Sequence, residues 1–359
     1  MSGHSQLSSF ELEIIVSQSS DRNRRIVLAS RPVGAPTEEN FRLETSALPV
    51  PSPGELLLRT VYLSLDPYMR GRISDAPSYA KPVEVGEVMV GGTVSRVVQS
   101  NAEGFSPGDW VLSASGWQDY AVAPARQVRR LDPADGEPQL ALGVLGMPGF
   151  TAYMGLLDIG QPKAGETVVV AAATGPVGAT VGQIARIKGC RVVGIAGGAE
   201  KTAYAREVLG FDDAIDHRAP DFAQRLKAAC PDGIDVYFEN VGGAVFDAVF
   251  PLLNTKARVP VCGLISQYNA TGAQQEADRL APFMRGVLTK RLRIQGFIIF
   301  DDYGASYGDF AHQMGLWVRS GEVKHREDIV QGLDQAVTAF QGLLQGKNFG
   351  KLIVQVAKD

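Results

Sequence analysis

The stretch Val168-Val-Val-Ala-Ala-Ala-Thr-Gly-Pro-Val-Gly-Ala-Thr-Val-Gly182 decides the fold of this chain. It begins as a short apolar, β-branched run, which is typical of a buried parallel strand. The run breaks at Thr174 and Gly175, and small or apolar residues then recur at helical spacing. The stretch therefore predicts a strand, a glycine turn and a helix, in that order.

A turn of this kind can bind the pyrophosphate of a dinucleotide. Gly175 lets the backbone approach the phosphates, Gly178 lets the helix pack close to the strand, and the helix N-terminus offers free N–H groups. Ala173 stands where the first glycine of the usual G-x-G-x-x-G pattern would be. Because the motif taken alone is weakly specific, an ordinary strand–helix turn stays open at this point.

Length and composition limit the class of protein. The 359 residues suggest about two domains, and the 45% hydrophobic and 21% charged content is ordinary for a globular protein. A net charge of −4 without a basic block argues against a nucleic-acid partner. The sequence has neither an apolar run long enough for a membrane span nor an apolar N-terminal signal core. Three widely spaced cysteines suit a reducing compartment, so we expect a cytoplasmic protein.

The hydrophobic pattern changes along the chain. Residues 24–130 contain short β-rich runs separated by proline and glycine clusters, which predicts a small, irregular barrel. From Leu140 onward, helical patterns alternate with apolar strands, as in a parallel sheet covered by helices. With the glycine turn, this alternation predicts an α/β fold with a Rossmann doubly wound parallel sheet.

Individual elements follow from the same patterns. After the run that begins at Val168, the expected strands are 191–196, 213–216, 234–238, 258–262, 292–300 and 351–356, and the expected helices are 201–209, 221–229, 246–253 and 331–345. Pro260 fits a central strand poorly because it has no N–H to donate to the ladder. We keep the strand at 258–262 in spite of it.

Six motifs carry a family resemblance. They are Leu65-Asp-Pro-Tyr-Met-Arg70, Met147-Pro-Gly-Phe-Thr-Ala-Tyr153, Ala172-Ala-Thr-Gly-Pro-Val-Gly178, Tyr237-Phe-Glu-Asn-Val-Gly-Gly243, Val261-Cys-Gly-Leu-Ile-Ser-Gln-Tyr-Asn269 and Lys347-Asn-Phe-Gly-Lys351. With these motifs, the chain resembles the medium-chain dehydrogenase/reductase superfamily. Within it, the chain is most similar to the zinc-free prostaglandin reductase branch and, in that branch, to the bacterial curcumin reductases.

The resemblance implies an architecture and a cofactor. A GroES-like β-barrel domain, expected at residues 1–140 and 315–359, carries an inserted Rossmann domain at residues 141–314. NADPH is expected in the cleft between them, and the family implies a homodimer. The sequence lacks the Gly-His-Glu zinc-ligand motif of the alcohol dehydrogenases, and its four histidines are scattered, so no metal site is expected.

Lys201 is the first candidate for recognising the cofactor. NAD-preferring folds usually place an acid about 20 residues after the first glycine, whereas the corresponding window here, 195–199, has no carboxylate. The 2′-phosphate of NADPH would therefore meet no repelling carboxylate at this position, and the cation of Lys201 would lie nearby. Spacing alone leaves a solvated surface lysine equally open, and the family resemblance favours the phosphate-binding role.

The other candidates rest largely on the resemblance. Asn240 follows a strand end, where an amide can bind ribose or nicotinamide, although a turn asparagine is an alternative. His217 replaces a tyrosine of the mammalian branch, and its role stays open. The expected cofactor-binding residues are Thr174, Gly175, Pro176, Val177, Gly178, Gly197, Lys201, His217, Asn240, Cys262, Tyr268, Phe297 and Asn348.

Two tyrosines are candidates for catalysis. The phenol of Tyr68, and second that of Tyr268, can donate a hydrogen bond to an oxygen that gains negative charge, although each could instead be a packing residue. The resulting hypothesis is a zinc-independent, NADPH-dependent reductase of the C=C bond of conjugated ketones (enones). A quinone reductase on the same scaffold, or an NADPH-binding protein without turnover, stays an alternative.

Overall fold

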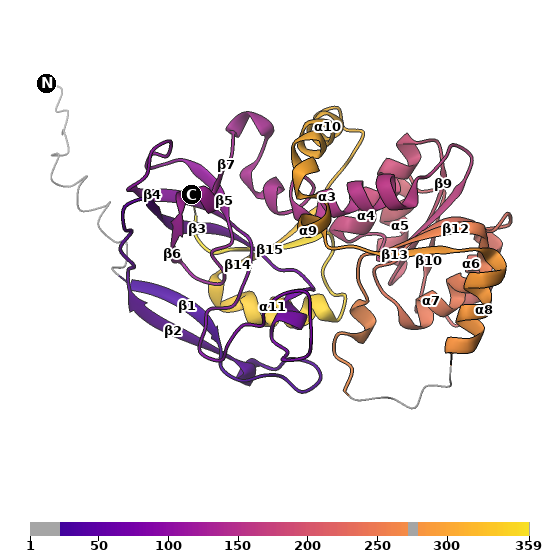
Figure 1. The fold of residues 1–359 in the computed structure, drawn as a ribbon, viewed down its shortest axis with the longest axis horizontal. Coiled ribbons are helices and arrows are strands. Elements are labelled where there is room, and N and C mark those ends of the chain that lie inside the picture. The colour runs from indigo at the N-terminus through magenta and orange to yellow at the C-terminus, as the bar shows by residue number, and fades with distance from the viewer. Residues whose placement is uncertain (1–21, 272–278, 359) are drawn as a thin grey trace, which may run out of the picture.

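The computed structural model describes residues 22–271 and 279–358. Figure 1 shows two lobes, one built mainly of strands from the two ends of the chain and one in which helices flank a sheet. In the part of the chain that is described, no helix has the length and apolar character needed to cross a membrane.

The α/β lobe contains the predicted Rossmann sheet. Within the described residues it has six strands, all paired in parallel, in the order β10-β9-β8-β11-β12-β13. They are β8 (Thr167–Ala171), β9 (Arg191–Ala196), β10 (Asp213–Asp216), β11 (Ile234–Phe238), β12 (Leu253–Val261) and β13 (Arg293–Gly296). The strand order reverses beside β8, so ligands are expected beyond the carboxyl ends of the strands near it.

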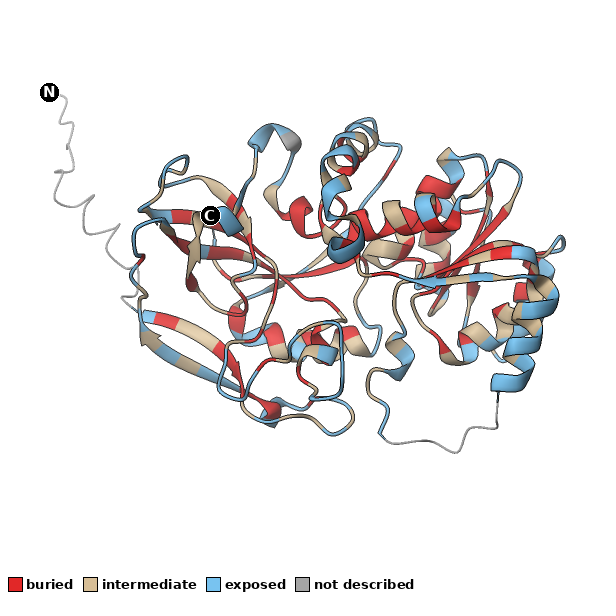
Figure 2. Cartoon of the chain, in the orientation of Figure 1, coloured by how far each residue is buried: buried red, intermediate tan, exposed pale blue. Residues whose placement is uncertain are grey.

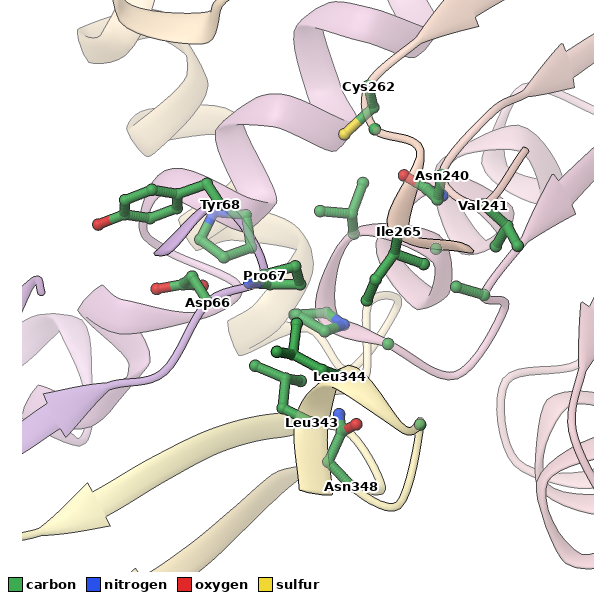
Figure 3. Close-up of a pocket in the computed structure, with 18 of the residues that line it drawn as sticks. Asp66, Pro67, Tyr68, Asn240, Val241, Cys262, Ile265, Leu343, Leu344 and Asn348 are labelled. Atoms are coloured by element: carbon green, nitrogen blue, oxygen red, sulfur yellow. The ribbon is translucent and has the colours of Figure 1, made fainter. Parts of the chain in front are cut away.

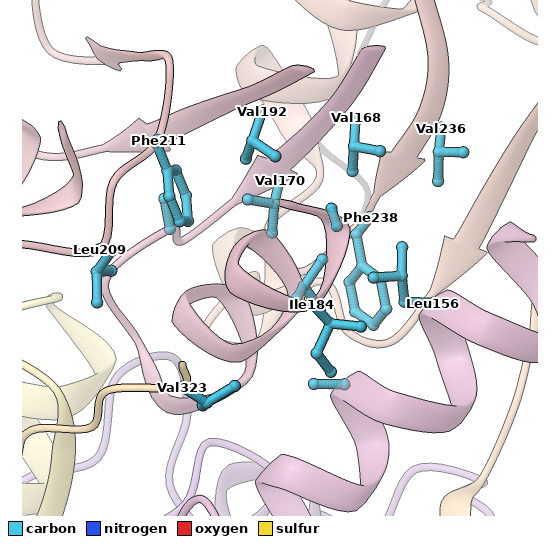
Figure 4. Close-up of a cluster of buried hydrophobic side chains, with 14 of the residues drawn as sticks. Leu156, Val168, Val170, Ile184, Val192, Leu209, Phe211, Val236, Phe238 and Val323 are labelled. Carbon is cyan, nitrogen blue, oxygen red and sulfur yellow. The ribbon is translucent and has the colours of Figure 1, made fainter. Parts of the chain in front are cut away.

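Helices cover both faces of this sheet (Figure 1). The helices of this lobe are α3 (Met147–Met154), α4 (Pro176–Ile187), α5 (Ala199–Glu207), α6 (Phe222–Ala229), α7 (Gly243–Val249), α8 (Leu280–Lys290), α9 (Ile299–Tyr303) and α10 (Tyr307–Arg319), of which α9 and α10 pack against α3. One hydrophobic cluster joins β8, β11 and α4 through Val170, Phe238 and Ile184, as Figure 4 shows. A Cβ at Gly178 would lie 2.3 Å from the carbonyl oxygen of Ala172, which agrees with the close helix–strand packing predicted there.

The other lobe holds a seven-stranded sheet among the described residues, ordered β14-β15-β3-β4-β5-β7 with β6 paired to β3. Its members are β3 (Glu55–Ser64), β4 (Thr93–Ser100), β5 (Trp110–Ser113), β6 (Tyr120–Pro124), β7 (Arg129–Arg130), β14 (Glu327–Gln331) and β15 (Lys351–Gln355), beside the hairpin of β1 (Arg22–Leu28) and β2 (Phe41–Ala47). Because β15 pairs antiparallel with β3, the C-terminus returns to the N-terminal domain.

The predicted limit between the Rossmann domain and the C-terminal part of the barrel domain needs to move. The limit between 314 and 315 falls inside α10. Phe310 and Met314 of this helix share a buried cluster with Val323 and with the core of the Rossmann domain. We therefore propose that the Rossmann domain continues to about residue 323.

Three predicted elements need correction. The strand expected at 292–300 is only four residues long, because the chain leaves the sheet after Gly296 and Phe297 and Ile299 turn inward to a buried cluster beside α3. In the stretch expected as a helix at 331–345, Gln331 is the last residue of β14 and Gly332 has a φ of 91°. A 3₁₀ turn at Leu333–Gln335 then leads into α11 (Ala336–Leu344). The helix expected at 246–253 begins at Gly243 and ends at Val249. The strand containing Pro260 is confirmed, in register with β13, but it begins at Leu253 rather than at Arg258 and ends at Val261.

Candidate active site

A cavity of about 470 Å³ lies between the two domains, at the carboxyl ends of the central Rossmann strands. In Figure 3, Asp66, Pro67 and Tyr68 approach it from the barrel domain, while Asn240, Val241, Cys262 and Ile265 approach from the Rossmann domain. Asn348 comes from the C-terminal segment. Every predicted site residue lines this cavity: Tyr68, Thr174, Gly175, Pro176, Val177, Gly178, Gly197, Lys201, His217, Asn240, Cys262, Tyr268, Phe297 and Asn348.

The glycine turn forms one wall of the cavity. Gly175 is the N-cap of α4, and Ala179 makes the first backbone bond of the helix, to the carbonyl oxygen of Gly175. Pro176 has no N–H group. The N–H groups of Val177 and Gly178 have no acceptor within the helix, because they lie in its first turn. They are suited to an anion, as is the positive end of the helix dipole.

Cations gather beyond β9, at Gly197. A Cβ at Gly197 would lie 3.0 Å from both Arg218 Nε and His217 Nε2, and Lys201 lines the same part of the cavity. Burial and the charge of Arg218 lower the pKa of Lys201, and the same two causes lower the pKa of His217. Because Lys201 and Arg218 repel each other, an anion bound between them would relieve the repulsion.

Arg218 was missed in the sequence. Its signal would have been the end of the third strand, where Asp216, His217 and Arg218 are consecutive. The backbone N–H groups of Gly198 and Arg218 donate to the Asp216 carboxylate and lower its pKa, so this acid is held by the loops that shape the cationic end.

The Lys201 ammonium is tied to the C-terminal segment. Its Nζ donates to the carbonyl oxygens of Gly346 at 2.8 Å and Asn348 at 2.5 Å. The amine is half-buried, so the alternative of a freely solvated surface lysine does not describe it. Lys201 therefore joins α5, at the cationic end of the cavity, to the segment that leads into β15.

Asn240 and Glu239 shape the loop after β11. The Asn240 amide donates to the carbonyl oxygen of Ala171 at 2.8 Å, which joins the carboxyl ends of β11 and β8. Glu239 is 1% exposed and its Oε1 accepts bonds from the Tyr237 hydroxyl and from the N–H groups of Val241 and Gly242. Sequence reasoning assigned Glu239 no role, although its burial makes it the anchor of this loop.

Three phenols also line the cavity. Tyr68 precedes α2 (Met69–Arg72), Tyr268 follows β12 through a short 3₁₀ turn, and the half-exposed Tyr79, which the sequence analysis missed, lies near both. Burial raises the pKa of all three, and the Asp66 carboxylate raises that of Tyr68 further. Each is therefore a hydroxyl donor at neutral pH.

A buried ion pair supports the turn that carries Tyr68. Lys351 Nζ lies 2.6 Å from Asp66 Oδ1 and donates to the carbonyl oxygen of Leu65 at 2.9 Å. Ser64 donates to the other carboxylate oxygen of Asp66. Lys351 is 2% exposed, so a charge pair inside the barrel domain positions residues 65–68.

The donor set of the described residues differs from that of a metal centre. Nowhere in residues 22–271 or 279–358 do three or more His, Cys, Asp or Glu side chains gather as a possible metal site. Cys262 lines the cavity, and burial, with the charge of the Glu239 carboxylate, raises the pKa of its thiol.

Comparison with known proteins defines the class to which this fold and cleft belong. A family model described as the N-terminal domain of oxidoreductase matches residues 24–131, and one described as zinc-binding dehydrogenase matches residues 176–313. The chain belongs to the medium-chain dehydrogenase/reductase superfamily, which confirms the resemblance and the predicted fold class.

Its relatives narrow the class further. The chain is 63% identical to the NADPH-dependent curcumin reductase of Escherichia coli over 95% of its own length and 99% of the relative's. It is 41% identical to prostaglandin reductase 1 of Rattus norvegicus, covering 90% and 95% of the two chains. The crystal structure of CurA from Vibrio vulnificus in complex with NADPH matches with a TM-score of 0.91 at 62% identity, covering 94% of this chain and 100% of that one.

We expect Cys262 to react slowly with electrophiles, although it faces the cavity. Burial, with a contribution from the Glu239 charge, raises the pKa of this thiol to about 12. The thiolate is the reactive form, so its population at pH 7 is far below that of an ordinary cysteine and rises about tenfold per pH unit. Mass spectrometry should show iodoacetamide labelling of Cys262 climbing through pH 7–10 without a plateau. A plateau near pH 8.5 would contradict the raised pKa.

Proposed function

We propose that this protein is a zinc-independent, NADPH-dependent reductase of the C=C bond of enones. The observation that carries the proposal is that two cations, Lys201 and Arg218, and three phenols line one cavity. The names of its relatives, an NADPH-dependent curcumin reductase and a prostaglandin reductase, support the same activity.

The residues of the cleft fit NADPH. The free N–H groups of Val177 and Gly178 suit its pyrophosphate, and Lys201 and Arg218 suit a 2′-phosphate. The absence of a side chain at Gly197 leaves room beside Arg218, because a Cβ there would touch the guanidinium at 3.0 Å. Asn240, Cys262, Phe297 and Asn348 line the remainder of the cavity between the cations and the phenols.

The phenols stabilise the charge that the reaction creates. When bound, NADPH supplies a hydride to the β-carbon of the enone, and negative charge then develops on the ketone oxygen. Tyr68, and second Tyr268, donate hydrogen bonds to that oxygen, and these bonds strengthen as it becomes an enolate. The Tyr268 oxygen itself accepts the N–H of Leu264, which orients its O–H. Protonation of the α-carbon completes the reduction.

Stopped-flow oxidation of NADPH by a panel of enones and quinones tests this function. Wild-type protein should turn over enones faster than quinones and give the saturated ketone, with a chelator having no effect. Tyr68→Phe removes only a hydroxyl and should lower kcat by about 10²–10³, the cost of deleting one oxyanion donor, with NADPH affinity nearly unchanged. Tyr268→Phe should also lower kcat.

Tyr153→Phe is the matched control, because Tyr153 lies in α3 and does not line the cavity. Its kcat should equal that of wild type. Full turnover by Tyr68→Phe would make Tyr68 a packing residue. An allylic alcohol as product, or loss of activity with a chelator, would overturn the proposed mechanism.

We expect a preference for NADPH over NADH. Each charge-assisted hydrogen bond to the 2′-phosphate is worth about 1.5–3 kcal/mol, or roughly tenfold to hundredfold in affinity. Arg218→Ala should therefore lower kcat/KM for NADPH by that factor and leave kcat/KM for NADH nearly unchanged. Lys201→Ala should reduce the preference too, and should weaken both cofactors because Lys201 also ties residues 346 and 348.

Arg225→Ala is the control for Arg218→Ala and Lys201→Ala, since Arg225 is an exposed arginine on α6 that does not line the cavity. Steady-state kinetics with both cofactors gives the comparison. A wild-type preference for NADH would contradict the assignment, and an unchanged preference in Lys201→Ala would remove Lys201 from it.

We also propose that two copies of the chain form a homodimer through β13 and α8. β13 stands at the end of the strand order, and three apolar residues of α8 point outward at a spacing of four: Leu280, Met284 and Leu288 are 65%, 54% and 76% exposed. Figure 2 shows this helix largely exposed. The opposite face of α8 packs inward through Phe283 against Phe250. An exposed strand edge beside an apolar stripe invites a second chain.

Light scattering at micromolar concentration should give twice the 38.4 kDa of the monomer. Leu288→Glu places a charge in the apolar stripe and should shift the mass towards the monomer. Val50→Glu, at a residue that is 83% exposed in the barrel domain, is the control and should stay dimeric. A monomeric wild type would contradict the proposal.

The remaining assignments concern where the enzyme works. We propose a cytoplasmic location and a small-molecule partner without nucleic acid or membrane, supported by the net charge of −4 and the ordinary composition. These stay predictions of the sequence.

A further inference from the structure

Arg70 makes an interdomain contact that the proposed chemistry leaves without a role. Arg70 is 6% exposed and lies in α2 of the barrel domain. The Nε atom donates to Asn269 Oδ1 of the Rossmann domain at 3.1 Å, and Nη2 donates to the carbonyl oxygen of Gly34 at 2.8 Å. One guanidinium thus joins three segments that are far apart in the sequence.

The position of this contact relates it to the phenols. Arg70 stands two residues after Tyr68, and Asn269 directly follows Tyr268. Both belong to motifs singled out in the sequence, and neither of them lines the cavity. The hydrogen bond between them therefore connects the two backbone segments that carry the proposed oxyanion donors, from behind the site.

The geometry requires arginine rather than any cation. A guanidinium presents its N–H donors in a rigid planar fork, whereas a lysine ammonium is a point charge on a flexible stem. Here the fork serves two neutral oxygens, those of Asn269 and Gly34, in two different segments. Gly34 itself has a φ of 77°, and a Cβ there would lie 3.3 Å from Thr271 Cγ2, so this loop also closes on the Tyr268 segment.

We propose that Arg70 is a positioning residue that sets the spacing of Tyr68 and Tyr268 across the interdomain cleft. The proposal rests on the proposed enone reduction. A displacement of a catalytic group by about 1 Å can cost on the order of 10² in rate. Arg70 does not line the cavity, so its loss acts on the chemical step while cofactor binding is retained.

Arg70→Lys and Asn269→Ala test the proposal in the full-length enzyme. Each should lower kcat for an enone by about 10–100-fold, with the dissociation constant of NADPH changed less than about threefold. The primary isotope effect with NADPH deuterated at the transferred position should rise, because hydride transfer becomes rate-limiting. The double variant should be little worse than Arg70→Lys alone, since both substitutions remove the bond between Arg70 and Asn269.

Two variants serve as controls. Asn269→Asp keeps an oxygen acceptor for the guanidinium and should retain most of the kcat. Arg72→Lys changes a neighbouring arginine whose Nε bonds the carbonyl oxygen of Lys81 within the same domain, and should retain wild-type kcat and isotope effect.

The outcomes are distinct. If Arg70→Lys and Asn269→Ala lower the melting temperature but keep kcat and the isotope effect, the contact is structural only and the proposal is overturned. If Arg70→Lys fails to fold, Asn269→Ala alone decides. If the wild-type protein reduces no enone, the proposed function fails, and this inference fails with it. If the wild type and both variants all reduce the enone at the normal rate, the proposed function stands and only this inference fails.

Discussion

The antiparallel pairing of β15 with β3 is the constraint on which the rest of the structure depends. Ile353 lies opposite Ser64, so the chain leaves β3 at the same edge where it enters β15. The Tyr68 turn and the segment that contains Asn348 are therefore neighbours, although Asp66 and Lys351 are 285 residues apart in the sequence. The chain enters the Rossmann domain after β7 and returns from it through β14, which pairs with β15, so both crossings involve this same sheet.

Hydrogen bonds from two side chains then fix the position of the two domains relative to each other across the cleft. Lys201 binds the segment before β15 at the cationic end of the cavity, and Arg70 binds Asn269 at the phenol end. Between them, the buried pair of Lys351 and Asp66 fixes the turn that carries Tyr68. Burying such a pair costs desolvation energy, which the bond from Lys351 to the carbonyl oxygen of Leu65 helps to offset. These contacts bring cations and phenols to one cleft.

Local patterns predicted most of the Rossmann sheet, because its strands are buried on both faces and read as continuous apolar runs. The strand at 234–238 agrees with β11 and that at 213–216 with β10. The same reasoning was wrong at 292–300, where an apolar run continues past Gly296 although the chain has left the sheet. An apolar run indicates that its residues are buried, but it does not indicate which element they are buried against. Phe297 and Ile299 pack beside α3, which lies far away in the sequence.

The sequence by itself determined the class of fold, the cofactor and many of the residues that line the cleft, because a glycine turn between a buried strand and a helix, and the motifs of the family, are local. Only the tertiary structure decided what those residues do to one another. Arg218 became part of the cationic end because β10 lies beside β9, and Tyr79 joined the phenols because its loop lies against the cavity. Arg70 acquired a partner 199 residues away only when the domains met. Hydrogen bonds and charges act over a few ångströms in space, so a linear pattern cannot specify which distant segment will supply the partner.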